Sequence, residues 1–172
     1  DVARPARPAG ALVWLHVPDP DGAASMVQLA RRIIAEHSAS VLLTCPQPLP
    51  CAQRGLVQHL PPADIAAEAR AFFDHWQPDL AIFADGELRP ALLLEAQKRN
   101  LPLLMVEART PYLLKGRGGW YPGLIRECLN SFKEIMVLDD VSAREFRRAG
   151  ASNIALSGRM EEPSAALSYH EP

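Results

Sequence analysis

Short apolar runs alternate along this chain with longer stretches of helical periodicity, and residues 78–109 (PDLAIFADGELRPALLLEAQKRNLPLLMVEAR) are the clearest example. Residues 80–83 and 103–106 are apolar and predict two strands. Residues 88–99 carry apolar and charged positions at helical spacing and predict a helix between them. A strand, a helix and a second strand form a βαβ unit, whose strands are parallel and whose connection is right-handed.

The same alternation extends over the rest of the chain and predicts an α/β fold, a three-layer α/β/α sandwich around a Rossmann-like, mostly parallel sheet of six or seven strands. Further strands are expected at residues 11–16, 41–44, 56–60, 134–138 and 153–156. Further helices are expected at residues 23–37, 62–76, 121–132 and 139–149, the second of them capped near Asp64 and the last ending at Gly150. Residues 1–10 read as a flexible lead-in, 11–158 as the domain, and 159–172 as a linker toward a C-terminal domain that this chain lacks.

Size and composition narrow the classes of function. With 172 residues, 48% of them hydrophobic, the chain fits one domain with a conventional core. A net charge of −2 argues against nucleic acid as a partner, because such proteins usually present a basic face. No apolar run approaches the ~20 residues of a membrane span. Three cysteines without a CxxC pair fit a reducing, cytoplasmic setting, and no metal site or cofactor is expected.

Polar residues gather where the predicted strands end. Asp85, Glu87 and Arg89 follow the strand at 80–83, and Arg109 follows the strand at 103–106. In open parallel sheets, ligands bind outside the carboxyl ends of the strands, so these side chains are binding candidates. The chain has no GxGxxG after its first strand and no P-loop, GxSxG or HExxH motif. A dinucleotide-binding domain or a P-loop enzyme is therefore not expected.

Three motifs together resemble the N-terminal domain of 3-deoxy-D-manno-octulosonic acid (Kdo) transferases. They are WLH at residues 14–16, an acidic-xELxP turn at 85–90, and EAR at 107–109; the closing SGRM at 157–160 also fits. The resemblance implies the N-terminal half of a GT-B glycosyltransferase. It implies transfer of Kdo from CMP-Kdo, bound through the missing C-terminal domain, to a lipid A precursor or another anionic glycolipid. It also implies a peripheral position at the inner face of the inner membrane of a Gram-negative bacterium.

The turn after WLH departs from the family pattern. The family carries a Gly-Glu pair there, whose Glu is taken as the catalytic base, and Gly22 falls at or beside that position in this chain. Asp21 is the nearest carboxylate and the candidate replacement, with Asp19 as a second candidate. Both aspartates are also typical of a solvated turn that caps the following helix. The family's ELWP reads Glu87-Leu88-Arg89-Pro90 here, so a cation replaces an aromatic side chain.

The resemblance and the strand-end positions together nominate acceptor-binding residues, namely His16, Asp85, Glu87, Arg89, Arg109, Lys115 and Arg117. The basic stretch from Arg109 onward suits a phosphate-bearing partner, and its aromatic neighbours favour contact with an amphiphile at a membrane surface. Other interpretations stay open: Glu87 as a helix cap, and the basic stretch as a solvated loop.

Two other functions stay open at this point. A non-catalytic paralogue would keep the domain as a glycolipid- or protein-binding module without the family's chemistry. A flavodoxin-like or receiver-like domain is suggested by Asp139-Asp140 after a predicted strand, although the remaining acidic and lysine positions of a receiver do not follow.

Overall fold

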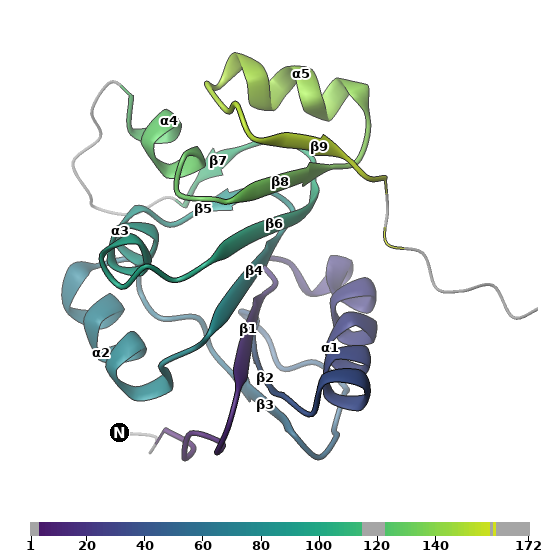
Figure 1. The fold of residues 1–172 in the computed structure, drawn as a ribbon, viewed down its shortest axis with the longest axis vertical. Coiled ribbons are helices and arrows are strands. Elements are labelled where there is room, and N and C mark those ends of the chain that lie inside the picture. Colours follow the sequence, from purple (N-terminus) through teal and green to yellow (C-terminus); the bar gives the residue numbers. More distant parts are fainter. Residues whose placement is uncertain (1–3, 115–122, 159, 161–172) are drawn as a thin grey trace, which may run out of the picture.

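A computed structural model describes residues 4–114, 123–158 and 160. It confirms the α/β fold: the strands form one seven-stranded sheet in the order β3-β2-β1-β4-β6-β8-β9, and every neighbouring pair is parallel (Figure 1). The strands are β1 (Leu12–His16), β2 (Ser40–Thr44), β3 (Leu56–His59), β4 (Leu80–Ala84), β6 (Leu103–Ala108), β8 (Glu134–Val137) and β9 (Ile154–Leu156). A separate two-stranded sheet pairs β5 (Glu87–Leu88) with β7 (Tyr112–Leu113).

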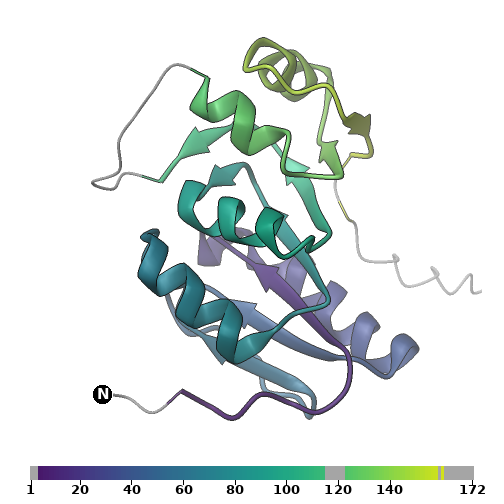
Figure 2. The ribbon, with the colours of Figure 1, turned by 60° about the vertical axis from the view of Figure 1, so that its left-hand side comes forward.

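The helices cover the two faces of the sheet unequally. They are α1 (Ala23–His37), α2 (Ala66–Trp76), α3 (Pro90–Lys98), α4 (Leu124–Leu129) and α5 (Asp140–Arg148), with a short 3-10 helix, η1 (Pro20–Gly22), before α1. Buried residues of α1 share one core cluster with strand residues, while those of α2 to α5 share the other. Figure 2 shows α2 and α3 side by side over the same face.

The central strands are apolar because they are buried on both faces. Trp14 of β1 is fully buried, with its ring centroid 4.7 Å from that of Phe72 in α2 and 5.0 Å from that of Phe83 in β4. This aromatic cluster fixes the centre of the sheet against α2. Among the described residues, no helix is long and apolar enough to cross a membrane.

Three predicted helix starts were wrong. The helix predicted at residues 121–132 is α4, which begins after Gly123 and covers only Leu124–Leu129. The helix predicted from residue 88 begins at Pro90, because proline favours the first helical position and disfavours helical geometry in the residue before it. The helix predicted from residue 62 begins at Ala66. Asp64 does not cap that helix; its Oδ1 accepts the backbone N–H groups of Ala91 (2.9 Å) and Leu92 (3.2 Å), so it caps α3 from a separate segment.

The lead-in from residue 4 to residue 10 lies along α2. The guanidinium of Arg7 donates to the backbone carbonyls of Trp76 (2.7 Å) and Gln77 (3.2 Å), which end that helix. Arg4 donates to the carbonyl of Ala71 at 3.2 Å. The two Arg7 bonds satisfy carbonyl groups at the C-terminus of α2 that have no intrahelical partners.

The order of the strands places one switch point in the sheet. From β1 the chain first moves outward to β2 and β3, and it then returns to the other side of β1 to form β4. The connections on the two sides of β1 therefore diverge at the carboxyl ends of β1 and β4, which is the position where open α/β sheets bind ligands.

Candidate functional site at the carboxyl ends of the strands

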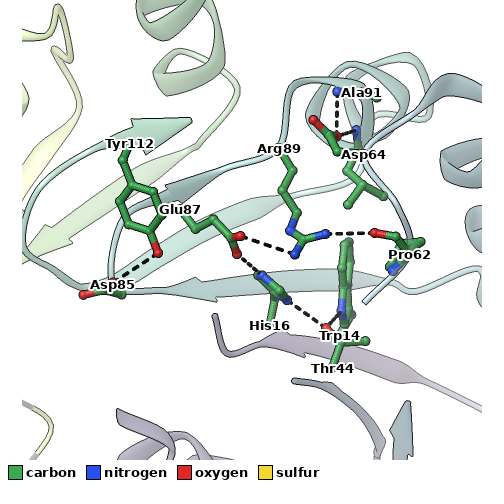
Figure 3. A network of polar contacts seen from close by, with 11 residues as sticks. Trp14, His16, Thr44, Pro62, Asp64, Asp85, Glu87, Arg89, Ala91 and Tyr112 are labelled. Atoms are coloured by element: carbon green, nitrogen blue, oxygen red, sulfur yellow. Dashed lines mark hydrogen bonds and ion pairs between the residues drawn. The ribbon is translucent and has the colours of Figure 1, made fainter. Parts of the chain in front are cut away.

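A buried polar network lies directly beneath the switch point (Figure 3). His16, the last residue of β1, is fully buried, and its Nε2 lies 2.5 Å from Oε2 of Glu87 in β5. The guanidinium of Arg89 donates to Oε1 of Glu87 at 3.3 Å and to the carbonyl of Pro62 at 2.8 Å. Glu87 and Arg89 are only 3% and 4% exposed. The network therefore ties β1, β5 and the segment before α2 together.

The hydrogen bonds assign the proton on His16. The indole N–H of Trp14 donates to Oγ1 of Thr44 at 2.8 Å, and that hydroxyl lies 3.0 Å from Nδ1 of His16. With the hydroxyl donating to Nδ1, Nε2 carries the proton and donates to Glu87. Burial lowers the pKa of His16, although Glu87 acts in the opposite direction, so the ring is neutral.

Glu87 stays ionised in this environment. Burial acts to raise its pKa, but the hydrogen bond from His16 and the charge and hydrogen bond of Arg89 lower it. The network is therefore a buried ion pair of Glu87 and Arg89 oriented by a neutral imidazole, an arrangement in which each charge depends on its partner.

The turn after β4 is held in an unusual backbone conformation. Asp85 has a φ of 75° and Gly86 a φ of 147°. A Cβ on Gly86 would lie 2.2 Å from the carbonyl oxygen of Thr110, so only glycine fits there. The carbonyl of Asp85 accepts the Arg109 N–H at 2.7 Å, and that of Gly86 accepts the Tyr112 N–H at 3.1 Å. Non-glycine residues with positive φ often occur at functional sites.

Above the buried network, an accessible polar group lines the switch point. The Asp85 carboxylate lies 3.4 Å from the Tyr112 hydroxyl and 3.8 Å from Nε of Arg109. Burial raises the pKa of Asp85; Arg109 and Tyr112 oppose this rise, while the negative charges of Asp19 and Glu87 add to it. Burial, with the same negative charges, also raises the pKa of Tyr112. An aspartate, a tyrosine hydroxyl and a guanidinium together can bind and deprotonate hydroxyl groups and pair with anions.

The end of β6 carries a second acidic residue in the left-handed region. Glu107 has a φ of 49°. Its carboxylate accepts the hydroxyl of Ser25 in α1 at 2.8 Å and the backbone N–H of Met160 at 2.9 Å. It therefore links β6, α1 and the segment that follows β9.

The structure places the sequence-predicted residues in three groups. His16, Glu87 and Arg89 form the buried network, so Arg89 points inward toward Glu87 and not into solvent. Asp85 and Arg109 form the accessible group, with Asp19 close enough to influence Asp85. Asp21 lies in the exposed η1 helix, where the side chain of Asp19 accepts its N–H at 2.9 Å. Lys115 and Arg117 lie outside the described residues. Acceptor contact by any of these residues stays a prediction.

Sequence reasoning gave no site role to Thr44 and treated Tyr112 only as one of the residues favouring contact with an amphiphile. Thr44 ends β2, and its position at a strand end, beside the strand that ends in WLH, could have marked it as a candidate site residue. Tyr112 was grouped with the aromatic residues of the following loop, and its pairing with β5 follows from the tertiary fold. Among the described residues, no group of three or more His, Cys, Asp or Glu side chains is arranged to hold a metal ion.

Fold and site together define a parallel α/β domain with a polar, partly strained site at the switch point of its sheet. A family model described as 3-deoxy-D-manno-octulosonic-acid transferase (kdotransferase) matches residues 2–161. The chain therefore belongs to the Kdo transferase family, as its WLH, ELxP and EAR motifs indicated.

Individual relatives agree with this membership. The chain is 30% identical over 102 residues to a 3-deoxy-D-manno-octulosonic acid transferase of Rickettsia bellii, and the match covers 58% of this chain but only 24% of the relative. Among solved structures it resembles a UDP-GlcNAc 2-epimerase from Neisseria meningitidis bound to UDP-GlcNAc (TM-score 0.52, 12% identity, 84% of this chain and 45% of the other). It also resembles a protein of Listeria monocytogenes assigned as a UDP-N-acetylglucosamine 2-epimerase (TM-score 0.55, 14% identity, 95% and 50%). At these identities the structural likeness concerns the fold.

Proposed function

We propose that this chain is the acceptor-side domain of a Kdo-transferase-like glycosyltransferase, which transfers Kdo from CMP-Kdo to a lipid A precursor. Family membership over residues 2–161 supports the class. The observation that carries the proposal is the accessible group of Asp85, Tyr112 and Arg109 at the switch point. It combines a carboxylate, suited to a sugar hydroxyl, with a guanidinium, suited to a phosphate.

Each part of the site has a distinct role in this proposal. Arg109, whose side chain is 59% exposed, pairs with an anionic group of the acceptor. Lys115 and Arg117, which follow in the sequence, stay predicted acceptor contacts outside the described residues. His16, Glu87 and Arg89 hold the turn that presents Asp85. CMP-Kdo binds to a further domain of the full-length protein, and transfer takes place between the two domains.

The proposed substrate also sets the location. A lipid A precursor is an amphiphile, so the enzyme works at the inner face of the inner membrane of a Gram-negative bacterium, in peripheral contact with it. Tyr112, Leu113 and Leu114 next to Arg109 support this, since aromatic, aliphatic and cationic side chains occur together at membrane interfaces.

The test uses the full-length protein with CMP-Kdo and a lipid A precursor in detergent micelles, and follows the mass of the acceptor. The expected product is heavier by one or more Kdo residues. Arg109→Gln is expected to raise the KM for the acceptor about tenfold or more through loss of a charge-assisted contact. Arg32→Gln is the matched control, because Arg32 is 69% exposed on α1 and pairs only with Glu36 among the described residues.

A second candidate is a non-catalytic paralogue that binds glycolipid or protein; it is favoured because Gly22 falls at or beside the position where the family pattern carries its catalytic Glu. That candidate predicts that the folded full-length protein binds the lipid A precursor without changing its mass. If the full-length protein neither transfers Kdo nor binds the precursor at high micromolar concentration, the transferase and a glycolipid-binding module are both excluded, and only a protein-binding module is left.

A further inference from the structure

Five carboxylates lie at or just beyond the carboxyl ends of β1, β4 and β6, and the structure gives them very different surroundings. They are Asp19, Asp21, Asp85, Glu87 and Glu107. A general base must reach the hydroxyl that it deprotonates, keep a lone pair free for the proton, and have a pKa near the working pH. These three conditions separate the five side chains.

Glu87 and Glu107 already use both of their oxygens. Glu87 is 3% exposed, and its oxygens accept from His16 and Arg89, which lower its pKa and weaken it as a base. In Glu107, one oxygen accepts the Ser25 hydroxyl and the other the Met160 N–H. Both residues hold structural elements together, and each of their carboxylate oxygens already accepts a hydrogen bond.

Asp19 and Asp21 lie in the turn after β1 and are exposed. Oδ1 of Asp19 caps η1 by accepting the Asp21 N–H at 2.9 Å. Within the described residues, the Asp21 carboxylate makes no hydrogen bond or ion pair that would orient it. Asp19 contributes to the electrostatic environment of Asp85, whereas Asp21 is not among the charges that shift its pKa. Nothing therefore directs Asp21 toward the switch point.

Asp85 fits these conditions better than the other four, because it is accessible and burial raises its pKa from the ordinary value of an aspartate. Its side chain is 38% exposed; Oδ2 accepts one long hydrogen bond from the Tyr112 hydroxyl at 3.4 Å, and Oδ1 lies 3.8 Å from Nε of Arg109, so both oxygens keep room for a further hydrogen bond. Its backbone is fixed by hydrogen bonds to Val106 and Arg109 of the neighbouring strand segment. The positive φ is thus imposed by the surrounding structure, which holds the carboxylate at the switch point.

We propose that Asp85 is the general base of the transfer reaction in this chain, in place of the glutamate that Gly22 replaces. This inference rests on the proposed function. The acceptor hydroxyl oxygen attacks the anomeric carbon of Kdo and forms the new C–O bond. The bond from that carbon to the phosphate oxygen of CMP breaks, and CMP leaves with the electron pair. The hydroxyl proton passes to an oxygen of Asp85.

The groups that face Asp85 come from four elements. Asp19 faces it from the turn after β1, Glu87 from β5, Arg109 from the end of β6, and Tyr112 from β7. Burial and the two carboxylates raise the pKa of Asp85 and make it a stronger base, while Arg109 and Tyr112 act in the opposite direction. The rate is expected to fall on the acid side as Asp85 becomes protonated.

The test compares Asp85→Asn with Asp21→Asn in the full-length protein, using initial rates of Kdo transfer between pH 5 and pH 9. Asparagine keeps the shape of aspartate and tolerates positive φ better than most residues, so Asp85→Asn is expected to fold. We expect kcat to fall by about 10²–10⁴-fold with little change in acceptor KM, because general-base catalysis contributes a factor of that size. The acid limb of the pH–rate profile should disappear with it. Asp21→Asn should retain the wild-type kcat and acid limb.

The possible results separate this inference from the proposed function. Wild-type transfer that persists in Asp85→Asn to within about threefold would overturn the assignment of the base and leave the function standing. If Asp21→Asn loses kcat while Asp85→Asn stays active, the general base is Asp21 in the turn after β1. No transfer by the wild-type protein would overturn both. Circular dichroism and acceptor binding by Asp85→Asn show whether a lost kcat reflects chemistry or folding.

Discussion

Removing Arg89 would leave a buried charge without its partner. The Glu87 carboxylate and the Arg89 guanidinium are 4% and 5% exposed and 3.3 Å apart. Arg89→Met keeps the length and much of the volume of the side chain but deletes the charge. The remaining partner of Glu87 is His16, whose pKa is lowered by burial, so its ring cannot readily become a cation in compensation.

The expected cost is large for a single substitution. Deleting one partner of a buried ion pair typically destabilises a protein by about 3–5 kcal/mol, since the other charge remains desolvated. Whole domains are stable by only about 5–15 kcal/mol. With a urea slope of about 2 kcal/mol/M, the midpoint of unfolding should fall by about 2 M. Arg32→Met, which breaks the exposed pair with Glu36, should cost less than about 1 kcal/mol.

The pKa of Glu87 predicts how the difference in stability between wild type and Arg89→Met changes with pH. The folded wild-type protein holds the pKa of Glu87 low, so this group stabilises the fold above its unfolded pKa, and the contribution is lost as pH falls through the folded pKa. In Arg89→Met, burial dominates and the pKa of Glu87 rises. Protonation then relieves the penalty, so the stability gap between variant and wild type should narrow as pH falls from 7 toward 4.

Urea unfolding of wild type, Arg89→Met, Glu87→Gln and the double variant, followed by circular dichroism at pH 7 and pH 5, measures these quantities. The double variant should be less destabilised than the sum of the two single variants, because it leaves no unpaired charge. An Arg89→Met variant within about 1 kcal/mol of wild type, or strict additivity in the double variant, would show that the pair is not coupled as the geometry indicates.

Three further predictions concern positions outside this pair. Gly86→Ala should lower the free energy of unfolding by more than about 1 kcal/mol, since its Cβ would lie 2.2 Å from the Thr110 carbonyl oxygen. The control Gly22→Ala has open space around the new Cβ and should change that energy by less than about 0.5 kcal/mol, so equal melting temperatures of the two variants would contradict the prediction. Asp64→Ala should destabilise the protein by about 1 kcal/mol, because it removes the cap of α3. Asp64→Asn should destabilise it less, because asparagine keeps an acceptor oxygen and removes a partly buried carboxylate whose pKa is raised by desolvation. Equal melting temperatures of the two variants would refute this. Cys128 is 5% exposed, and burial raises its pKa to about 12. It should therefore react with a thiol reagent at pH 8 only after the protein unfolds, which mass spectrometry of the labelled peptides can check.

Much of the fold was predictable because its central strands and longest helix have strong local signals. The helix predicted at residues 23–37 coincides with α1. Of its apolar stripe, Met26, Ala30 and Ile33 are buried, whereas Leu29 and Ile34 are only partly buried. The strand ends were predicted to within a residue or two, since apolar runs in a buried parallel sheet end where the chain returns to solvent. The start of α2 was not predictable from Asp64, since a capping residue can serve a helix that is distant in sequence.

The candidate site was predicted in part. Position at a strand end and family motif singled out His16, Asp85, Glu87, Arg89 and Arg109, and the structure brings all of them to one end of the sheet. Neither signal distinguishes a buried side chain from an accessible one. Glu87 and Arg89 were treated as equivalent to Asp85, yet they lie in the interior while Asp85 is partly exposed.

The sequence by itself determined the alternation of strands and helices, the parallel sheet and the kinship, because these depend on periodicity and local motifs. Only the tertiary structure decided which carboxylates are buried in hydrogen bonds and ion pairs and which are accessible. Residues two apart in the turn after β4, Asp85 and Glu87, differ because β5 pairs with β7 and turns Glu87 inward to His16 and Arg89. Exposure, charge partners and pKa arise from segments far apart in the chain, and no local pattern contains them.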